Sequence, residues 1–184
     1  MGIFKNLFDR KSDNKTFEDY CNMSSEEMLA LSDSRLADVI GMRIEQEEEI
    51  FCEDERNEDK SFISILNEAQ YIYAAVSAFG MEINNGGLGQ FFLGESRRFA
   101  PYVSEGLHEI GADEIQKLFD DAVFKRGINI NELLDVAETD EVAYNDMILQ
   151  YGFEDFDDAV AKVYEKESLE KLLIGYARKN IELL

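Results

Sequence analysis

The chain has 184 residues, of which 45% are hydrophobic, enough for one well-packed core and short for two. Its 40 acidic residues outnumber its 18 lysines and arginines, which gives a net charge of -22. A surface of this charge repels nucleic acids and anionic membranes and attracts basic proteins, which mostly bind nucleic acid themselves. We therefore expect neither direct nucleic-acid binding nor membrane binding.

The cysteines and the apolar runs indicate where the protein works. Cys21 and Cys52 are the only cysteines, and no apolar signal segment precedes them. No apolar run reaches the length of about 18 residues that a membrane-spanning helix needs. Because unpaired cysteines are typical of reducing compartments, we expect a cytoplasmic protein.

Residues 1–20 are predicted to form a separate element, made of a short amphipathic helix and a polar connector over residues 9–16. The apolar residues of this helix lie three and four positions apart, at Ile3, Phe4, Leu7 and Phe8. Residues 21–184 are predicted to form one helical domain.

Two helices are predicted between residues 24 and 51. Ser24 and Glu27 have the spacing of a capping box and precede the apolar pair Met28 and Leu29. Asp33 is expected to cap a second, longer helix. The apolar stripe of that longer helix consists of Leu36, Val39, Ile40, Ile44 and Phe51.

A central helix is predicted from Ser61 to Gly80, where the glycine is expected to end it. Its apolar residues keep a 3.6-residue period, at Phe62, Ile65, Leu66, Ala69, Ile72, Tyr73, Val76 and Phe79. Residues 84–87 (Asn-Asn-Gly-Gly) are then expected to form a sharp corner, because asparagine and glycine tolerate positive φ.

The rest of the chain is also predicted to be helical. Leu88, Phe91 and Phe92 suggest a short helix, while Pro101 suits the first turn of another and Gly111 its C-terminal end. Further helices are expected over residues 112–123, 131–138, 140–151, 153–164 and 169–177. No segment alternates with the period of a strand. The predicted fold class is all-α, a single-domain irregular bundle of roughly seven to nine helices.

The sequence contains no established motif for catalysis or metal binding. His108 is the only histidine, which is too few for a zinc site built from several histidines. Residues 94–98 lack the second glycine of a nucleophile elbow, and residues 86–89 lack the Lys-Ser/Thr end of a phosphate-binding loop. The acidic clusters lack the spacing of a calcium-binding loop. We therefore predict a protein that is not an enzyme and has no catalytic residue, cofactor or metal.

Two segments hold most of the excess negative charge. Residues 45–59 contain nine acidic residues and one arginine, and residues 132–158 contain ten acidic residues with no lysine or arginine. Acids four apart on a helix are about 6 Å apart along its axis, close to two axial steps of about 3.4 Å along one DNA strand. These segments are either solvated faces or partner-binding surfaces. The candidate partner-binding residues are Glu45, Glu47, Glu48, Glu49, Glu53, Asp54, Glu55, Glu132, Asp135, Glu138, Asp140, Glu141, Glu154, Asp155, Asp157 and Asp158.

Residues 82–92 read EINNGGLGQFF, which resembles the E-V-N-N-G-G-F-x-Q-F-F signature of the DNA mimic protein 19 domain family, a group of acidic bacterial proteins. Residues 107–112, 156–159 and 172–176 resemble other parts of that family, so the resemblance covers roughly residues 60–180. It implies an all-helical fold. The family's named member presents DNA-like charge to a DNA-binding repressor. The signature residues expected to be structural are Glu82, Asn84, Asn85, Gly86, Gly87, Gln90, Phe91 and Phe92.

The leading expectation for function is an acidic protein that binds a basic, DNA-binding protein by mimicking the charge of DNA. A first alternative is an immunity or antitoxin-like protein that neutralises a basic toxin such as a nuclease. A second is an enzyme that uses carboxylates around the Asn-Asn-Gly-Gly corner, with Glu82 and Gln90 converging in a polar pocket. Apolar stripes on several helices leave room for a homodimer.

Overall fold

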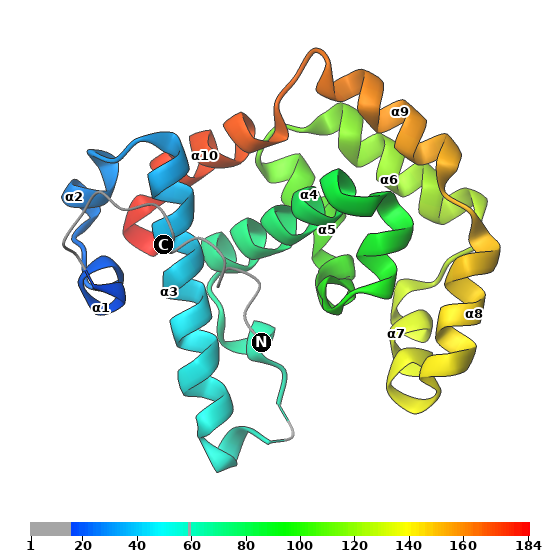
Figure 1. Cartoon of the computed structure of the whole chain (residues 1–184), viewed down its shortest axis with the longest axis horizontal. Coiled ribbons are helices and arrows are strands. Elements are labelled where there is room, and N and C mark those ends of the chain that lie inside the picture. Colours follow the sequence, from blue (N-terminus) through cyan, green and yellow to red (C-terminus); the bar gives the residue numbers. More distant parts are fainter. Residues whose placement is uncertain (1–15, 59) are drawn as a thin grey trace. The chain divides into compact units, whose positions relative to one another are not determined.

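The computed structural model describes residues 16–58 and 60–184, shown as the coloured ribbon in Figure 1. The predicted amphipathic helix at Ile3–Phe8 and nearly all of the polar connector lie outside these residues. The described residues form ten α-helices and no strand, which confirms the all-α prediction. Eight of the ten helices have ten or more residues, and the other two have five each. None of the described helices is long and apolar enough to cross a membrane.

The chain divides into two compact units, one of residues up to Tyr71 together with Ile174–Leu184, and one of Ile72–Leu173. The division falls inside two helices, α4 (Glu68–Leu93) and α10 (Leu169–Lys179). The other elements of the first unit are α1 (Phe17–Cys21), α2 (Ser25–Leu29), α3 (Asp33–Glu53) and the 3-10 turns η2 (Glu55–Asn57), η3 (Phe62–Ile65) and η5 (Ile181–Leu183).

The starts of α2 and α3 depend on side-chain caps. Ser24 and Glu27 form the predicted capping box, in which the Ser24 N–H donates to Glu27 at 2.9 Å and the Glu27 N–H donates to the Ser24 hydroxyl at 3.3 Å. The prediction for α3 was wrong by one residue, because Ser32 is the cap and Asp33 is the first helical residue. An acidic residue there still favours the helix, since it faces the positive end of the helix dipole. The predicted apolar stripe of α3 is buried.

Two arginines bind the C-terminal end of the chain to residues 23–33 within the first unit. Arg178 donates to the carbonyl oxygens of Leu29 (3.0 Å) and Leu31 (2.9 Å) and pairs with Asp33 at 2.7 Å. Arg43 donates to the carbonyl oxygens of Met23 and Leu184. These contacts satisfy carbonyl groups of turns that no helix ladder satisfies.

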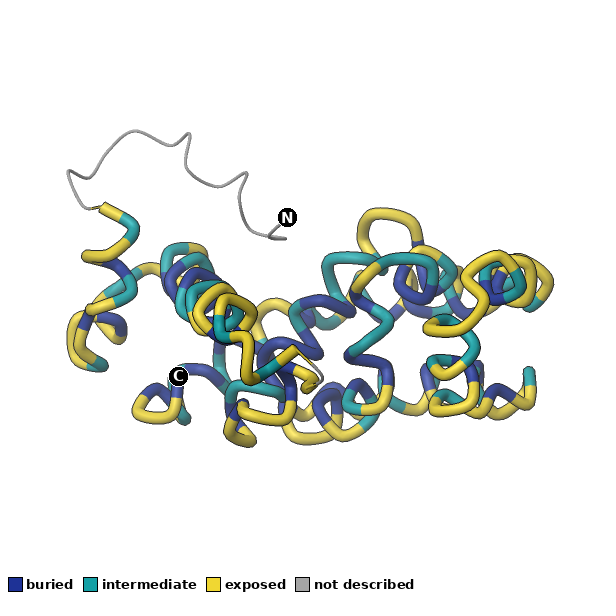
Figure 2. Tube along the Cα trace, turned by 90° about the horizontal axis from the view of Figure 1, so that it is seen from below, coloured by how far each residue is buried: buried dark blue, intermediate teal, exposed yellow. Residues whose placement is uncertain are grey.

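The second unit contains most of α4 and the start of α10, with six elements between them (Figure 1). These are η4 (Glu95–Phe99), α5 (Ala100–Glu109), α6 (Asp113–Lys125), α7 (Ile130–Thr139), α8 (Glu141–Tyr151) and α9 (Glu154–Tyr164). Helix α6 packs between α5 and α9, and α7 pairs with α8 as a hairpin. Buried positions recur along each helix between exposed ones (Figure 2), which is the pattern of amphipathic helices around a core.

The predicted central helix differs from α4 at both ends. Residues Phe62–Ile65 form a 3-10 turn, and the helix begins only at Glu68. The helix also continues through Gly80, contrary to the prediction. A Cβ atom at Gly80 would lie 3.0 Å from the Leu169 side chain. The glycine therefore allows Leu169 to approach the helix closely instead of ending it.

A close approach of this kind at Gly106 gives a prediction about stability. A Cβ atom at Gly106 would lie 2.8 Å from the buried Val76 side chain. We expect Gly106→Ala to lower the free energy of unfolding by about 1–3 kcal/mol through overpacking. The matched control is Gly175→Ala on α10, where nothing lies within 4 Å of the added atom. That control should raise the free energy by about 0.5–1 kcal/mol. Urea unfolding measures both, and equal effects of the two changes would contradict the packing argument.

Candidate functional site

The expected corner lies inside α4, at Gly86 and Gly87. Only these two residues leave the helical conformation, with φ of -164° at Gly86 and +79° at Gly87. The second value lies in the region that favours glycine. Asn84 and Asn85 stay in the helix, so the corner is narrower than the predicted four residues.

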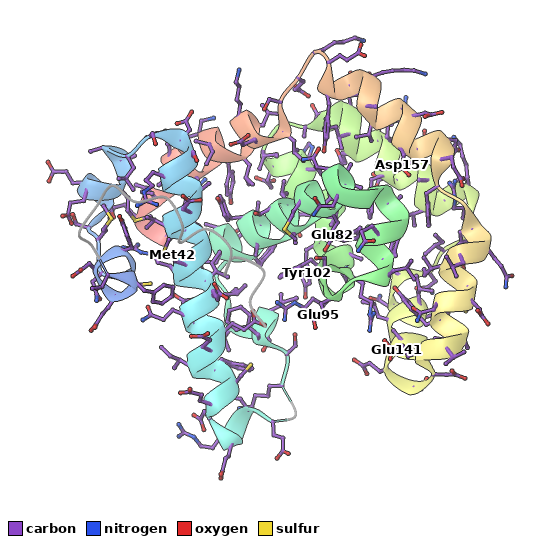
Figure 3. The ribbon with its side chains drawn as sticks, in the orientation of Figure 1. Met42, Glu82, Glu95, Tyr102, Glu141 and Asp157 are labelled. Carbon is purple, nitrogen blue, oxygen red and sulfur yellow. The ribbon has the colours of Figure 1, made fainter. Side chains whose placement is uncertain are left out.

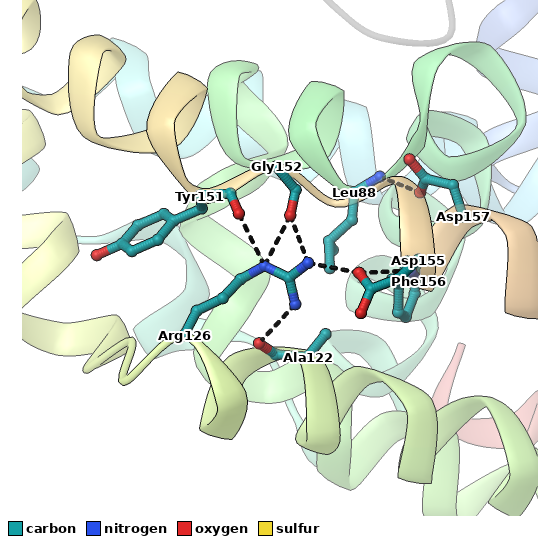
Figure 4. A network of polar contacts seen from close by, with 8 residues as sticks. All are labelled: Leu88, Ala122, Arg126, Tyr151, Gly152, Asp155, Phe156 and Asp157. Atoms are coloured by element: carbon teal, nitrogen blue, oxygen red, sulfur yellow. Dashed lines mark hydrogen bonds and ion pairs between the residues drawn. The ribbon is translucent and has the colours of Figure 1, made fainter.

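Asp157 of α9 stabilises the corner from across the second unit. The Leu88 N–H, the first after the break, donates to the Asp157 carboxylate at 2.9 Å (Figure 4). A Cβ atom at Gly87 would lie 2.3 Å from the same carboxylate, so only glycine leaves room for it. Asp157 therefore caps the second part of α4 as an N-cap side chain would, although it comes from another helix. This carboxylate is part of the fold and is not a freely exposed charge.

Burial raises the pKa of Asp157, and the hydrogen bond from Leu88 opposes that shift. The neighbouring carboxylates of Glu154 and Asp158 raise the pKa further.

The signature aromatics form the core around the corner. Phe91 and Phe92 are fully buried and pack edge to face, with ring centroids 5.4 Å apart. Phe92 also stacks on Phe153 at 5.7 Å, and Phe79 contacts Phe156 at 6.4 Å. Because Phe153 and Phe156 lie at the start of α9, these rings fix that helix against α4.

The polar signature residues lie in different surroundings. Glu82 accepts a hydrogen bond of 2.9 Å from Ser96, which is buried. Asn84, Asn85 and Gln90 are exposed, and their side chains make no hydrogen bond within the residues that the structure describes. Their predicted structural role stays a prediction. Across the same described residues, no group of three or more side chains has an arrangement that could hold a metal ion.

Arg126, which belongs to no motif of the sequence, joins α6 to the turn between α8 and α9 (Figure 4). Its side chain is 12% exposed and donates to the carbonyl oxygens of Gly152 (2.8 Å) and Tyr151 (3.3 Å). Its guanidinium lies 4.7 Å from the centre of the Phe153 ring and pairs with Asp155 at 2.5 Å. One feature of the sequence could have indicated Arg126. It is the last basic residue before residues 132–158, which contain no lysine or arginine.

The pair with Arg126 lowers the pKa of Asp155. Asp155 is thus the second acidic candidate that already has a partner inside the molecule.

Tyr144 joins the α7–α8 hairpin to the end of α4. Its hydroxyl donates to the Phe92 carbonyl at 2.6 Å and is buried. Burial raises the pKa of Tyr144 to about 12, while the guanidinium of Arg97, 5.0 Å from the ring centre, opposes the shift. The hairpin is therefore held on the signature segment by a hydrogen bond that stays intact across the physiological pH range.

The remaining acids of residues 132–158 are exposed. Asp140 caps α8 by accepting from the Ala143 N–H at 3.0 Å. Figure 3 labels Glu141 on the hairpin and Asp157 on α9. Within the described part of the chain, no side-chain hydrogen bond or ion pair engages the carboxylates of Glu132, Asp135, Glu138, Glu141, Asp146, Glu154 and Asp158.

The acids of the first unit lie on the second half of α3 and just beyond it. Glu45, Glu49 and Glu53 recur every four residues along one continuous helix, about 6 Å apart along its axis. The last turn of α3 has no basic residue, so the acids near it oppose the helix dipole. Glu47 accepts from Gln70 at 3.0 Å, and Asp54 pairs with Arg56 at 2.6 Å, which lowers the pKa of Asp54. Glu48 is half-buried and Glu55 is exposed.

The contact between Asp157 and Gly87 gives a prediction about pH. Since its pKa is raised in the folded protein, Asp157 stabilises the fold most below its ordinary pKa of 3.8, and this contribution is lost as pH rises through the raised value. Asp157→Asn keeps an acceptor for Leu88 and should remove that dependence at a cost below about 1 kcal/mol at neutral pH. Unfolding of both proteins across this pH range measures the difference. If the free energies of unfolding of the wild type and of Asp157→Asn differ by the same amount at every pH, Asp157 does not have a raised pKa in the folded protein.

Gly87→Ala should be much more damaging than Asp157→Asn, because the added atom needs the space of the carboxylate and the backbone needs positive φ. We expect a loss of about 2–4 kcal/mol in the free energy of unfolding. Gly89→Ala is the matched control, since its Cβ atom would lie at an ordinary 3.7 Å from Phe153. Comparable losses in urea unfolding for the two variants would show that Gly87 is not special.

Arg126 and Asp155 should differ in their effect on stability although they form one pair. Arg126→Ala leaves carbonyl groups of the α8–α9 turn without a donor and should cost about 2–3 kcal/mol. Asp155→Asn removes an ion pair whose acidic partner is mostly exposed and should cost less than about 1 kcal/mol. Thermal unfolding of the two variants tests whether Arg126→Ala loses more stability than Asp155→Asn. Equal losses of stability would contradict the prediction.

The model of the DMP19-like protein family matches residues 64–180. The match contains the Gly86–Gly87 corner, the aromatic cluster, Arg126 and the α7–α8 hairpin, and leaves out α1, α2 and α3. A search of curated proteins and a search of solved structures each found no match. Because the family match covers more than half of the 184 residues, the chain belongs to the DMP19-like protein family.

Proposed function

We propose that this protein binds a basic, DNA-binding protein by presenting carboxylates where DNA presents phosphates, and that it acts in the cytoplasm without catalysing a reaction. Membership of the DMP19-like family supports the proposal, as does the resemblance of the signature to DNA mimic proteins. The net charge of -22 supports it as well, because it favours association with basic surfaces.

The observation that carries the proposal is the uncompensated charge of the α7–α8 hairpin. Residues 132–158 contain no lysine or arginine, and five acids of the hairpin are exposed without a side-chain partner in the described part of the chain: Glu132, Asp135, Glu138, Glu141 and Asp146. Like charges this close lower the stability of the fold. A basic partner would relieve this repulsion and gain ion pairs at the same time.

The positions of the acids along their helices distinguish charges that help folding from charges that oppose it. Glu154 and Asp158 lie in or near the first turn of α9, where the helix dipole favours them. Glu49 and Glu53 lie near the C-terminal end of α3, and Glu138 lies near that of α7, where the dipole disfavours them. Local stability does not account for the second group, and a role in binding does.

The spacing of the α3 acids is consistent with mimicry of DNA. Glu49 and Glu53 are exposed and about 6 Å apart along the axis, close to two phosphate steps of one strand, whereas Glu45, one such step earlier, is half-buried. A surface that binds DNA with cations at such intervals could therefore meet carboxylates at similar intervals.

The experiment measures binding of the full chain to a panel of purified basic DNA-binding proteins over a range of ionic strength, with duplex DNA as a competitor. We expect affinity to fall steeply as salt rises, because exposed ion pairs are screened. We also expect duplex DNA to displace the protein. Binding confined to a nuclease toxin would favour the immunity alternative instead, and the absence of salt-sensitive binding to any panel member would overturn the proposal.

Neutralising the hairpin acids gives a residue-level prediction. The variant carries Glu132→Gln, Asp135→Asn, Glu138→Gln and Glu141→Gln, and it should bind about 10- to 100-fold more weakly at low salt. The control removes the same charge elsewhere, with the exposed residues Glu109, Glu165, Glu170 and Glu182 changed to Gln. If both variants lose affinity equally, overall charge decides binding and the hairpin has no special part in it.

A further inference from the structure

Helix α8 has apolar side chains on two opposite faces. Tyr144 and Ile148 point into the second unit and are buried. Val142 and Leu149 lie seven residues apart on the opposite face, where they are 73% and 70% exposed. Asp146 lies between them on the same face. A helix with apolar groups on both faces is normally covered on both sides, and nothing in the part of the chain that the structure describes covers the outer face of α8.

The charge around this outer face identifies what could cover it. Asp146 lies between Val142 and Leu149 on this face, and Glu141 directly precedes Val142. The hairpin carries three further unpaired acids on α7 and has no basic residue. A second copy of the chain, docked through the same face, would bring these acids against each other, which is strongly unfavourable in an interface that excludes water. A basic protein surface places cations opposite the same acids.

We propose that the outer face of α8, formed by Val142, Asp146 and Leu149, is a docking site for a basic protein surface in which aliphatic side chains lie between lysines or arginines. This inference rests on the proposed function and adds an apolar component to it. Carboxylates alone would imitate phosphates, and two outward aliphatic side chains serve no purpose in that imitation. Their burial against the partner would supply affinity that salt does not screen.

The hairpin also presents this face rigidly. Tyr144 and Ile148, on the inner face of the same helix, are buried, and the Tyr144 hydroxyl is bonded to the Phe92 carbonyl. Arg126 holds the turn that ends α8 at Gly152. A face fixed in this way loses little conformational entropy when a partner docks on it.

The experiment uses two synthetic helical peptides of equal positive charge, one with leucines and one with serines between its lysines. Binding to the full chain is measured at low and high ionic strength, for the wild-type protein and for Val142→Ser/Leu149→Ser. We expect the leucine peptide to bind the wild type more tightly, and the double variant to lose about 10- to 100-fold of that affinity. The salt dependence should stay the same, because the acids are unchanged. The serine peptide should bind both proteins equally.

The control variant Ile65→Ser/Leu183→Ser removes two exposed aliphatic side chains outside the hairpin and should bind like the wild type. Salt-dependent binding in which the two peptides are equivalent, or in which the Val142/Leu149 variant binds as the wild type does, would overturn the docking site while leaving the charge-based function standing. If neither peptide binds at low salt, both fail. If Val142→Ser/Leu149→Ser binds both peptides as the wild type does but has a lower molar mass in sedimentation, the face is a contact between copies of the chain and this inference is wrong.

Discussion

The hydrogen bond from the Leu88 N–H to the Asp157 carboxylate connects the break in α4 to the start of α9. It caps the part of α4 that follows the break, and it places the start of α9 beside that break. The bond exists only because Gly87 has no side chain, since a Cβ atom there would occupy the position of the carboxylate. The glycine, the aspartate and the aromatic rings around them therefore act together. The Gly-Gly pair is a requirement of packing as much as of backbone conformation.

The same region explains how an acidic hairpin can be held on the body of the protein. Ten acids and no base in residues 132–158 would repel one another and their surroundings. Arg126 counters this at one point, where it bonds to the α8–α9 turn and pairs with Asp155. Tyr144 provides a second attachment that carries no charge. Among the described residues, the hairpin is thus held by the mostly buried Arg126, by Tyr144 with its hydrogen bond and the Arg97 guanidinium beside its ring, and by apolar packing. Its own carboxylates remain exposed.

Features that depend on neighbouring residues could be predicted from the sequence, and features that depend on distant residues could not. The Ser24–Glu27 capping box and the buried stripe of α3 follow from spacing alone, and both were predicted. The course of the helix through Gly80 was missed because its reason is the approach of Leu169, almost ninety residues away in the chain.

The acidic candidates show this limit most clearly. Asp157 and Asp158 are adjacent and chemically identical, yet one is bonded inside the fold and the other is exposed. The helical period of Phe153, Phe156 and Val160 places Asp157 beside the apolar face of α9 and Asp158 away from it. The sequence does not show that the partner of Asp157 is the Leu88 N–H, because that group lies on another helix. Arg126 was not predicted for a similar reason, since its partners are backbone carbonyls. Every residue has such a carbonyl, so the sequence cannot show which of them accepts a hydrogen bond.

Charge and apolar surface contribute differently to the recognition that we propose for this protein. Exposed carboxylates attract basic partners over distances of about 10 Å, accelerate encounter, and are weakened by salt. They distinguish poorly between one basic protein and another, because many such proteins carry similar cations. The aliphatic side chains on the outer face of α8 act only at contact, and only against a partner with a matching apolar surface. A protein that presents both can be attracted by charge to many basic surfaces and retained by few, which is the behaviour that the proposed binding to one DNA-binding protein requires.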